Sequence, residues 1–407
     1  MSPVNHDPLV QMWSFQVERE LPSNFMVSVG YVGNDGTHLA GEPFRNFNYV
    51  PTKDMLQYKT DINTIVPITN VYSGATAAEL AKVYGTSELP LKTLLKPYPF
   101  FGAISGLVNV SSLDGATIYH AMNFKVQRRL SQGFQFTAAY TVSKKISNAM
   151  TTQLGWSVVD PIHAVGGIGG RSGVVGTSGY YQDPDNKKVD HAVAADDIPQ
   201  ILNIAGTYEL PFGAGRKYLN QKGPLNVLLG GWLLTGNFNA ERGLPLAISC
   251  PGNQITSRCD LIGDPHFTGS RTKEQQIAQW INPAAFSPAY GADQAFWGNY
   301  NPTDPRAWQF GTMGPRLANM RAPGFWNVDT SLSKQFHFTE STYLEFRWEA
   351  FNALNHQNPG FPNTSFCLPP LPDGTTDLVH QAGCSFGRIT NIQTDPRAMQ
   401  FALKFYW

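Results

Sequence analysis

Residues 400–407 read QFALKFYW, and their apolar side chains alternate with other side chains at a period of two. In a β-strand this alternation places every second side chain on the same face. The residues on that face are Phe401, Leu403, Phe405 and Trp407. Such a row is either buried in a soluble core or exposed to lipid, and the rest of the sequence decides between these two environments.

The composition favours many short strands and gives no electrostatic reason to expect nucleic acid as a partner. The chain of 407 residues has 30 Lys and Arg against 30 Asp and Glu, so its net charge is near zero. Charged residues make up only 15% of it, compared with roughly 25% in soluble domains. No apolar run approaches the roughly 18 residues that a membrane helix needs. The start, MSPVNHDPLVQMW, lacks the basic and apolar segments of a secretory signal.

The alternation at 400–407 recurs in four pairs of segments. The first pair is VQMWSFQVERELPSNFMVSVGYVG, and the second is YHAMNFKVQRRLSQGFQFTAAYTVSK. The third is PQILNIAGTYEL with GWLLTGNFNAE, and the fourth is WNVDTSLSKQFHFTESTYLEFRWEAFNAL. Together with a last strand from about Arg397 to Trp407, they predict about nine strands of about ten residues, the length that crosses an outer membrane at a tilt.

The connections between the predicted strands fall into two classes. Four stretches are long and rich in Gly, Pro, Asn and Tyr, namely residues 36–117, 145–197, 241–325 and 354–395. The others are short turns such as SQG, apart from a longer connection at 211–228. Short periplasmic turns and long extracellular loops are typical of outer-membrane barrels. The predicted fold class is therefore all-β, an antiparallel transmembrane β-barrel portion whose last strand runs toward the periplasm.

A soluble β-sandwich would show the same alternation, because one face of each of its sheets is also apolar. The aromatic residues favour the barrel, since they gather near strand ends as interfacial girdles do. They are Trp13, Tyr31, Tyr140, Trp232, Trp326, Trp348 and Trp407. The charged residues that we expect to face the lumen are Glu209, Glu345, Arg347, Glu349 and Lys404. We interpret them as a cross-strand charge ladder rather than as contacts to a plug or a solute.

Four cysteines form two local pairs, Cys250 with Cys259 and Cys367 with Cys384, each in a stretch rich in Gly, Pro and Asn. Two disulfides that close loops are the natural interpretation, and they indicate an oxidising compartment. Free thiols in a reducing compartment are the alternative. A zinc site is disfavoured, because the spacing is not CxxC and no His pair lies nearby at ligand spacing.

The sequence gives no pattern that indicates catalysis. Asp183, Asp185 and Asp190 match a calcium loop only loosely, since neither the twelfth-position Glu nor the central Gly is present, and we interpret them as a solvated acidic loop. Gly213 and Gly215 form a GxG without the strand and helix of a phosphate loop. GxSxG nucleophile elbows are absent. We therefore expect no enzyme activity, no metal and no cofactor.

Nearly the whole chain resembles one family. The stretches that carry the resemblance include VQMWSFQVERELPSNFMVSVGYVGNDGTHL, LLKPYPFFGAI, DIPQILNIAGTYELPFGAGRKYL, GFWNVDTSLSKQF, LEFRWEAFNALNHQNPGFPNTSF and FGRITNIQTDPRAMQFALKFYW. They resemble the C-terminal barrel of Oar-like TonB-dependent outer-membrane receptors, which carry a carboxypeptidase-regulatory-like domain at their N-terminus. The resemblance implies a barrel of about 22 antiparallel strands, a plug and energy from the TonB complex. Residues 1–407 would supply the last nine strands.

The sequence departs from this family in several respects. It shows no signal peptide, regulatory-like domain, plug or TonB box, so we expect a fragment of a larger gene. It ends on Trp where the family most often ends on Phe. Both are aromatic, so we expect the row from Phe401 to Trp407 to act as a signal for the barrel-assembly machinery. A nine-stranded piece has two unpaired strand edges, which hydrocarbon does not tolerate.

The sequence thus predicts part of a TonB-dependent receptor of the outer membrane that takes up an unidentified bulky solute. Its expected partners are outer-membrane lipid, the TonB complex through a plug, the barrel-assembly machinery and the solute. One alternative is a non-transporting adhesin or structural barrel, which the presence or absence of a plug distinguishes. Another is a soluble secreted β-sandwich that binds carbohydrate, which extraction with buffer rather than detergent identifies.

Overall fold

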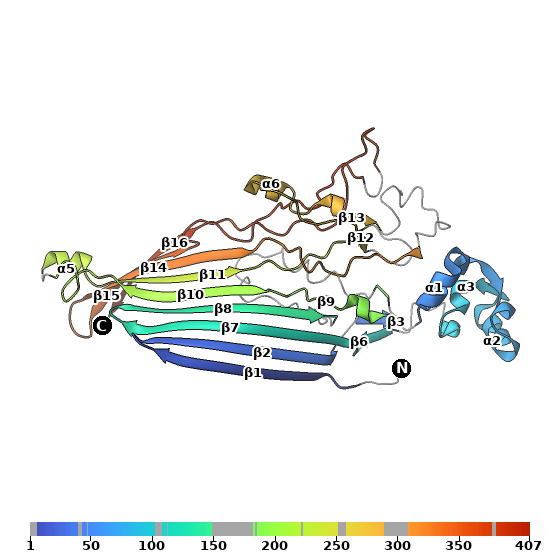
Figure 1. The fold of residues 1–407 in the computed structure, drawn as a ribbon, viewed down its shortest axis with the longest axis horizontal. Helices are drawn as coiled ribbons and strands as arrows, with labels where there is room; N and C mark the ends of the chain where they lie inside the picture. Colours follow the sequence, from blue (N-terminus) through green and yellow to red (C-terminus); the bar gives the residue numbers. More distant parts are fainter. Residues whose placement is uncertain are drawn as a thin grey trace.

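The computed structural model describes residues 6–39, 43–46, 48–101, 108–111, 113–148, 182–183, 185–220, 223–250, 258–288, 308–376 and 380–407. Its main element is an antiparallel sheet with the strand order β1-β2-β7-β8-β10-β11-β14-β15-β16, in which the short β9 also pairs with β8 (Figure 1). The strands of this sheet are β1 (Leu9–Leu21), β2 (Phe25–Leu39), β7 (Gly115–Ser131), β8 (Phe134–Ser147), β9 (Ala192–Val193), β10 (Gln200–Glu209), β11 (Trp232–Glu241), β14 (Phe325–His337), β15 (Tyr343–Phe351) and β16 (Ala398–Tyr406). Each long strand pairs with the next long strand of the sequence, so the sheet is a continuous meander.

This sheet confirms the predicted all-β architecture. All nine segments chosen from their alternation form long strands in the described residues, because β-branched and aromatic side chains at every second position suit a pleated surface. Some strands are longer than predicted. β2 continues to Leu39 and β7 begins at Gly115, within the stretch 36–117 that was interpreted as a loop.

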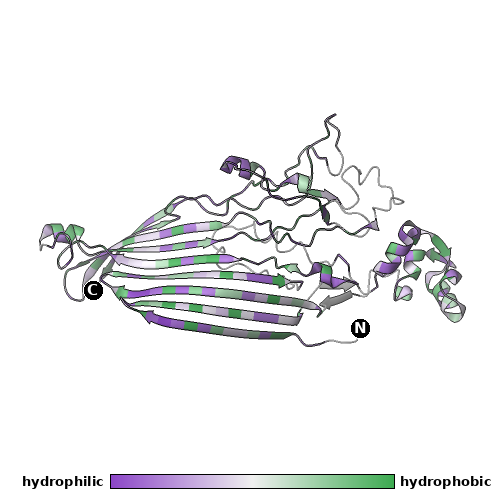
Figure 2. Ribbon diagram, in the orientation of Figure 1, coloured by the Kyte–Doolittle hydropathy of each residue, from purple (hydrophilic) through white to green (hydrophobic). Residues whose placement is uncertain are grey.

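The register gives the sheet two chemically different faces. Pairs such as Phe401 with Trp348 and Leu332 with Leu234 place the aromatic and aliphatic residues together on one face, which we call the apolar face. Figure 2 shows the resulting alternation of hydrophobic and hydrophilic residues along the strands. Trp13 lies opposite Gly33 on this face, and a Cβ added at Gly33 would lie 2.2 Å from the indole ring. The glycine therefore leaves the space that the indole occupies.

The two ends of the sheet differ as predicted. At one end the strands are joined by tight turns, and the turn between β7 and β8 uses Gln132 at φ 53° and Gly133 at φ 76°, in the region that favours glycine. The longer connection at 211–228 lies at this same end and ends in the short helix α5 (Pro224–Leu229), on the left in Figure 1. At the other end the chain forms extended loops.

The first long loop contains a small helical unit with its own core, which the sequence did not predict. Its elements are α1 (Thr52–Tyr58), η1 (Lys59–Asn63), β4 (Ile65–Pro67), η2 (Ile68–Asn70), α2 (Gly74–Tyr84), β5 (Glu88–Pro90), α3 (Leu91–Leu94) and η3 (Pro99–Phe101). Ile68, Leu80 and Leu94 are almost completely buried in this core. The unit lies beyond the loop end of the sheet, on the right in Figure 1. The stretch is therefore not a simple polar loop.

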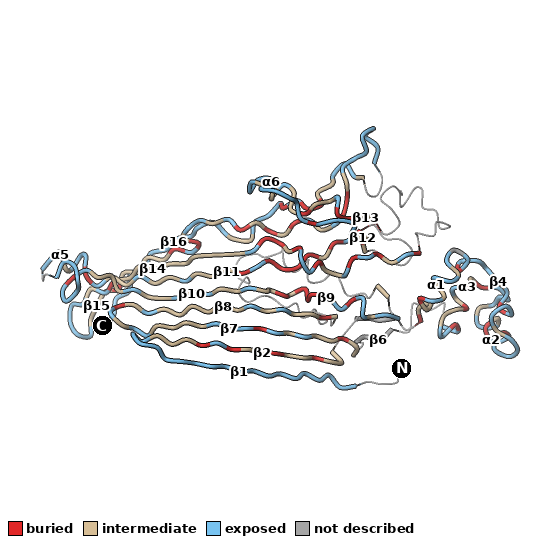
Figure 3. The backbone as a smooth tube through the Cα atoms, in the orientation of Figure 1, coloured by how far each residue is buried: buried red, intermediate tan, exposed pale blue. Residues whose placement is uncertain are grey.

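A second and larger core is formed by the loops that follow β11 and β15. It includes Leu246, Ile281, Phe286, Met313 and Phe386. The short elements of the loop after β11 are β12 (Cys259–Leu261), α6 (Lys273–Ala278), η5 (Pro283–Ala285) and β13 (Phe286–Pro288). Earlier loops contain β3 (Pro43–Asn46), β6 (Val108–Ser111) and η4 (Lys187–Asp190). Figure 3 shows that buried residues are concentrated in these loops, whereas β1 is exposed along its whole length. Among the described residues, no helix is both long and apolar enough to cross a membrane.

Candidate functional site

The charged residues predicted to face the lumen lie on the sheet face opposite the apolar face. On β15, Arg347 Nη2 lies 2.6 Å from a carboxylate oxygen of Glu345, and its Nη1 lies 3.6 Å from one of Glu349. Lys404 lies opposite Glu345 in the β15–β16 register. The ion pairs of Arg347 therefore run along one strand, whereas the sequence predicted a ladder across strands. Glu209 is bound at 2.5 Å by Arg216 of the 211–228 connection.

The residues of the predicted assembly signal form a continuous row on β16 and just beyond it. Phe401, Leu403 and Phe405 share the apolar face and are 70%, 66% and 52% exposed. Phe405 stacks on Trp407, with the ring centroids 6.1 Å apart. Side chains this apolar and this exposed require a hydrophobic environment. Recognition of the row by the assembly machinery stays a prediction.

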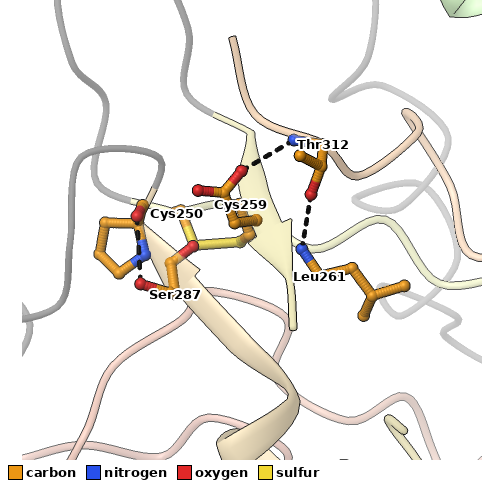
Figure 4. Close-up of a disulfide and its surroundings, with 7 residues drawn as sticks. Cys250, Cys259, Leu261, Ser287 and Thr312 are labelled. Carbon is orange, nitrogen blue, oxygen red and sulfur yellow. Dashed lines mark hydrogen bonds between the residues drawn. A yellow bond between two sulfur atoms is a disulfide. The ribbon is translucent and has the colours of Figure 1, made fainter. Parts of the chain in front are cut away.

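The four cysteines are joined within the loop core. The structure links Cys250 to Cys259 and Cys367 to Cys384, with Cα atoms 5.1 Å and 5.6 Å apart. Figure 4 shows the first disulfide beside the β12–β13 ladder, with Thr312 hydrogen-bonded to residues of β12. Leu261 N donates to Thr312 Oγ1 at 3.0 Å, and Thr312 N donates to an Asp260 carboxylate oxygen at 2.9 Å. The disulfide is thus part of an ordered cross-link between three loop segments.

Asp190 and its neighbours form a buried cluster of charges that connects the loops near the sheet. Its side chain is 6% exposed and pairs with Arg258, and Gln182 N donates to it at 3.1 Å. Burial raises the pKa of Asp190, although Arg258 acts to lower it. Burial also lowers the pKa of Arg316, whose guanidinium donates to the carbonyl oxygens of Val193 and Ser147. The predicted solvated acidic loop is therefore wrong for Asp190.

The other two aspartates of that stretch anchor the helical unit of the first loop. Thr52 Oγ1 donates to Asp183 at 2.6 Å, and the Thr52 backbone N–H donates to Asp185 at 2.7 Å. Tyr49 also donates to Asp185, at 2.7 Å. These carboxylates act as hydrogen-bond acceptors at the start of α1. In the described ranges, no group of three or more His, Cys, Asp and Glu residues is arranged to hold a metal ion.

A further pair of aspartates, Asp196 and Asp197, lies just before β10 and contacts Lys145 and Arg321. Lys145 Nζ lies 2.7 Å from an Asp196 carboxylate oxygen. Asp197 is buried and accepts the Lys145 backbone N–H at 2.5 Å and Arg321 Nη2 at 2.6 Å. Loops 145–197 and 241–325 are therefore joined by charged contacts as well as by packing.

Two hollows meet at the loop end of the apolar face, and the sequence analysis missed both. The first, which we call the rim groove, has a volume of about 660 Å³ and is lined by Tyr140, Leu202, Phe238, Ala240, Trp326 and His356, among others. The second, the arginine hollow, has a volume of about 380 Å³, and its lining includes Arg242, His266, Phe267, Arg271, Trp280 and Arg321. Arg242 and Gly324 line both. The sequence contained one signal of the arginine hollow. Arg242 follows Phe238 and Ala240 at the period of two that marks the apolar face of β11, and it places a charged side chain on that face.

The loop assembly is held by two disulfides, buried ion pairs and a hydrophobic core, so its surface is preorganised. The polar face of the sheet carries charges that are already paired along β15. These features support recognition by a rigid surface.

The structure is similar to solved structures of outer-membrane proteins at low sequence identity. No match was found among curated proteins. The structure is similar to the outer membrane transporter YddB from Escherichia coli, with 8% identity, a TM-score of 0.38, and coverage of 99% of this chain and 33% of that one. It is also similar to the ferripyoverdine receptor of the Pseudomonas aeruginosa outer membrane, with 9% identity, a TM-score of 0.35, and coverage of 98% and 27%. The chain spans a third or less of the length of these two proteins.

The family is identified by a match to the sequence as a whole. The model of the family described as "Outer membrane beta barrel domain" matches residues 1–400, almost the entire chain. The match agrees with the meander of long antiparallel strands, the apolar face and the contrast between tight turns and long loops. It locates the protein in the outer membrane. The chain belongs to the outer membrane beta barrel domain family.

Proposed function

We propose that this chain is the C-terminal barrel part of an Oar-like TonB-dependent receptor, which takes up a bulky solute across the outer membrane. The observation that carries this proposal is the difference in structure between the two ends of the sheet. One end has tight turns, while the other carries a loop assembly with its own core, two disulfides and buried ion pairs. A rigid scaffold that presents long, ordered loops on one side is suited to capturing a ligand.

The edges of the sheet support a larger barrel. Among the described strands, β1 pairs only with β2 and β16 pairs only with β15, so each has one edge without a partner. In hydrocarbon, such an edge leaves N–H and C=O groups without hydrogen-bond partners. Each group then costs roughly several kcal/mol, as any buried and unpaired polar group does. Further strands would pair these edges, and the enclosed lumen would be wide enough for a plug that the TonB complex moves.

Transport of this kind needs no chemical reaction on the solute, and we propose none. The loops would bind the solute, and energy from the inner membrane would release it into the periplasm. The assembly machinery would recognise the row from Phe401 to Trp407. The competing function is a barrel whose loops bind a surface partner without transport.

The test compares three strains of the native host: wild type, a deletion of the gene that encodes this chain, and a strain without TonB. Growth is measured on a panel of limiting nutrients that includes oligosaccharides, peptides and iron chelates. A nutrient on which both mutants fail, with growth restored by the intact gene, supports energised uptake. If the deletion strain grows like the wild type on every nutrient that requires TonB, the transport proposal is wrong. Loss of surface attachment in that strain would then support the adhesin.

A further inference from the structure

The rim groove lies at a defined height on the sheet. Tyr140 pairs with Leu202, Leu202 with Ala240, and Ala240 with Trp326, so these four residues form one row across four strands. They are on the apolar face, and the row is close to the points where β10 and β14 begin and β11 ends. In an outer-membrane protein this position is the loop-side boundary of the hydrocarbon layer.

An aromatic wall makes the upper part of the groove apolar. The His356 imidazole stacks on the Trp326 indole with the ring centroids 3.7 Å apart and the planes at 23°. Burial, assisted by nearby Lys273, lowers the pKa of His356, which keeps the imidazole neutral near pH 7. The groove thus offers uncharged rings and aliphatic side chains to an apolar ligand, and the charged residues Glu241 and Arg242 also belong to its lining.

Arg242 stands where this groove meets the arginine hollow. Its backbone N–H donates to the Gln200 carbonyl oxygen at 3.0 Å, so the β10–β11 ladder continues through it and its side chain belongs to the apolar face. The residue is exposed, and within the described part of the chain its guanidinium has no hydrogen-bond acceptor. A guanidinium at the hydrocarbon boundary is positioned to bind a lipid phosphate.

The rest of the hollow adds positive charge without a carboxylate in its lining. Arg271 donates to the carbonyl oxygens of Gln279 at 2.7 Å and Gln275 at 2.6 Å, and its guanidinium carbon lies 4.0 Å from the centre of the Phe267 ring. These neutral partners orient the guanidinium and leave its charge uncompensated. Arg321, by contrast, is neutralised by Asp197. Arg242 and Arg271 are therefore the two cations that the hollow offers to an anion.

The two hollows together select the occupant. A free anion would use the arginine hollow alone, and a free apolar molecule would use the rim groove alone. A membrane lipid with a phosphate headgroup uses both, because its headgroup lies at the boundary and its acyl chain lies beside the strands. Charge complementarity and the shared residue Arg242 thus point to one ligand.

We propose that the rim groove and the arginine hollow form a binding site for a phosphorylated lipid of the outer leaflet. The phosphate contacts Arg242 and Arg271, and one acyl chain lies in the groove beside Tyr140, Phe238 and Trp326. The site is on the outer surface of the sheet, so it does not depend on whether the protein transports a solute. It gives the loop assembly a fixed height relative to the membrane.

Native mass spectrometry of the full-length protein, purified from outer membranes in a non-ionic detergent, tests this proposal. Three probes are added separately: phosphatidic acid, diacylglycerol with the same acyl chains, and inorganic phosphate. We expect bound phosphatidic acid, with little diacylglycerol or phosphate. Arg242→Gln should weaken phosphatidic acid binding about tenfold or more, since hydrogen bonds to charged groups have about this effect. Arg242→Lys should retain part of the affinity, because it keeps the charge.

The matched control is Arg129→Gln, which removes an exposed arginine at the tight-turn end, where Arg129 pairs with Glu20. It should bind phosphatidic acid like the wild type. Heat-modifiable migration on a gel checks that each variant is folded, and Arg271→Gln replaces Arg242→Gln if the latter does not fold. Equal binding by the wild type and the folded hollow variant would overturn the proposal. Equal binding of diacylglycerol would reveal simple apolar adsorption, and equal occupancy by inorganic phosphate would reveal a free-anion site, and either result would also overturn it.

Discussion

Arg321 and Asp197 are 124 positions apart in the sequence, and their contact joins two loops. Arg321 Nη2 donates to the Asp197 carboxylate at 2.6 Å, and its Nη1 donates to the Asp197 carbonyl oxygen at 2.8 Å. The aspartate side chain is 1% exposed and the arginine side chain is 18% exposed. A charge pair this buried is costly to break from one side, because the remaining charge has lost its partner without regaining water.

Arg321→Met should therefore destabilise the loop assembly by about 3–5 kcal/mol. Asp197 would stay buried with the Lys145 backbone N–H as a remaining donor. Urea unfolding of the detergent-solubilised protein, followed by tryptophan fluorescence, measures this change. Arg129→Met is the control, since its pair with Glu20 is more than half exposed and such pairs contribute about 0–1 kcal/mol. Similar effects of both substitutions would show that the buried contact has no special structural role.

Reduction of the disulfides should loosen the loops and leave the sheet intact. Cys250 and Cys259 close a loop with a sequence separation of 9, and Cys367 and Cys384 close one of 17. Loop-closure entropy assigns each cross-link about 3 kcal/mol. Limited trypsin digestion before and after treatment with dithiothreitol measures the effect. We expect new cleavage within 241–325 and 354–395 only after reduction, while heat-modifiable migration persists.

The double variants Cys250→Ser/Cys259→Ser and Cys367→Ser/Cys384→Ser separate the two cross-links. Cys250, Cys259 and Cys367 belong to the buried core of the loops, so each double variant should increase cleavage mainly in its own loop. The wild-type protein, whose four cysteines all form disulfides, is digested with and without dithiothreitol. The same cleavage pattern in both digests would contradict this expectation.

The sheet was accessible to prediction because its information is local. Each segment by itself contains the alternation at a period of two. Because all apolar side chains must share one face, this alternation also restricts the register of pairs such as Phe401 with Trp348. Lys334 is an exception to the pattern. It lies on the apolar face opposite Trp232, where its ammonium group donates to the Gly230 carbonyl oxygen and lies 5.5 Å from the indole centre. Because Lys334 lies near a strand end, its ammonium group reaches a carbonyl oxygen and an aromatic ring while the side chain stays on the apolar face.

The loops were predictable only in part, because their contacts join distant segments. The helix α2 had a local signal, since Ala77, Leu80, Ala81 and Tyr84 recur at helical spacing, and all four pack in the core of the helical unit. The binding of Asp190 by Arg258 had no such signal. Neither the arginine hollow nor the rim groove follows from periodicity, because each is formed where separate loops meet the sheet.

A charge on the apolar face should prevent stable insertion of the last strand. Phe401 is 70% exposed and lies opposite Trp348, so it has lipid as its expected environment. Phe401→Arg should cost about 2–4 kcal/mol if the residue lies near the middle of the membrane. Folding into lipid vesicles, measured by heat-modifiable migration, tests this value. Gln400→Arg is the matched control, because Gln400 lies on the polar face opposite Glu349 and should tolerate a positive charge.

Equal folding of both variants would show that the apolar face is not in contact with lipid. Failure of Gln400→Arg alone would mean that the two faces are assigned the wrong way round. The pair of substitutions is informative because the two positions are adjacent in the sequence and differ in the face they occupy.

The stacking of His356 on Trp326 should make the stability depend on pH. Burial, with a contribution from Lys273, lowers the pKa of His356 below its usual value of 6.5. The unfolded chain therefore takes up a proton before the folded protein does. The contribution of this residue to stability is fully present above about pH 6.5 and is lost as the pH falls through 6.5 and then through the lowered pKa. Urea midpoints between pH 8 and pH 5, read from tryptophan fluorescence, measure this loss.

His356→Phe should keep the ring contact and remove this part of the pH dependence, because phenylalanine does not titrate. His337→Phe is the control at the tight-turn end, where His337 packs against Tyr343 with the ring centroids 5.1 Å apart. It should leave the loss of stability on acidification unchanged. If His356→Phe shows the same pH profile as the wild type, the protonation of this imidazole is not what weakens the loop end of the sheet.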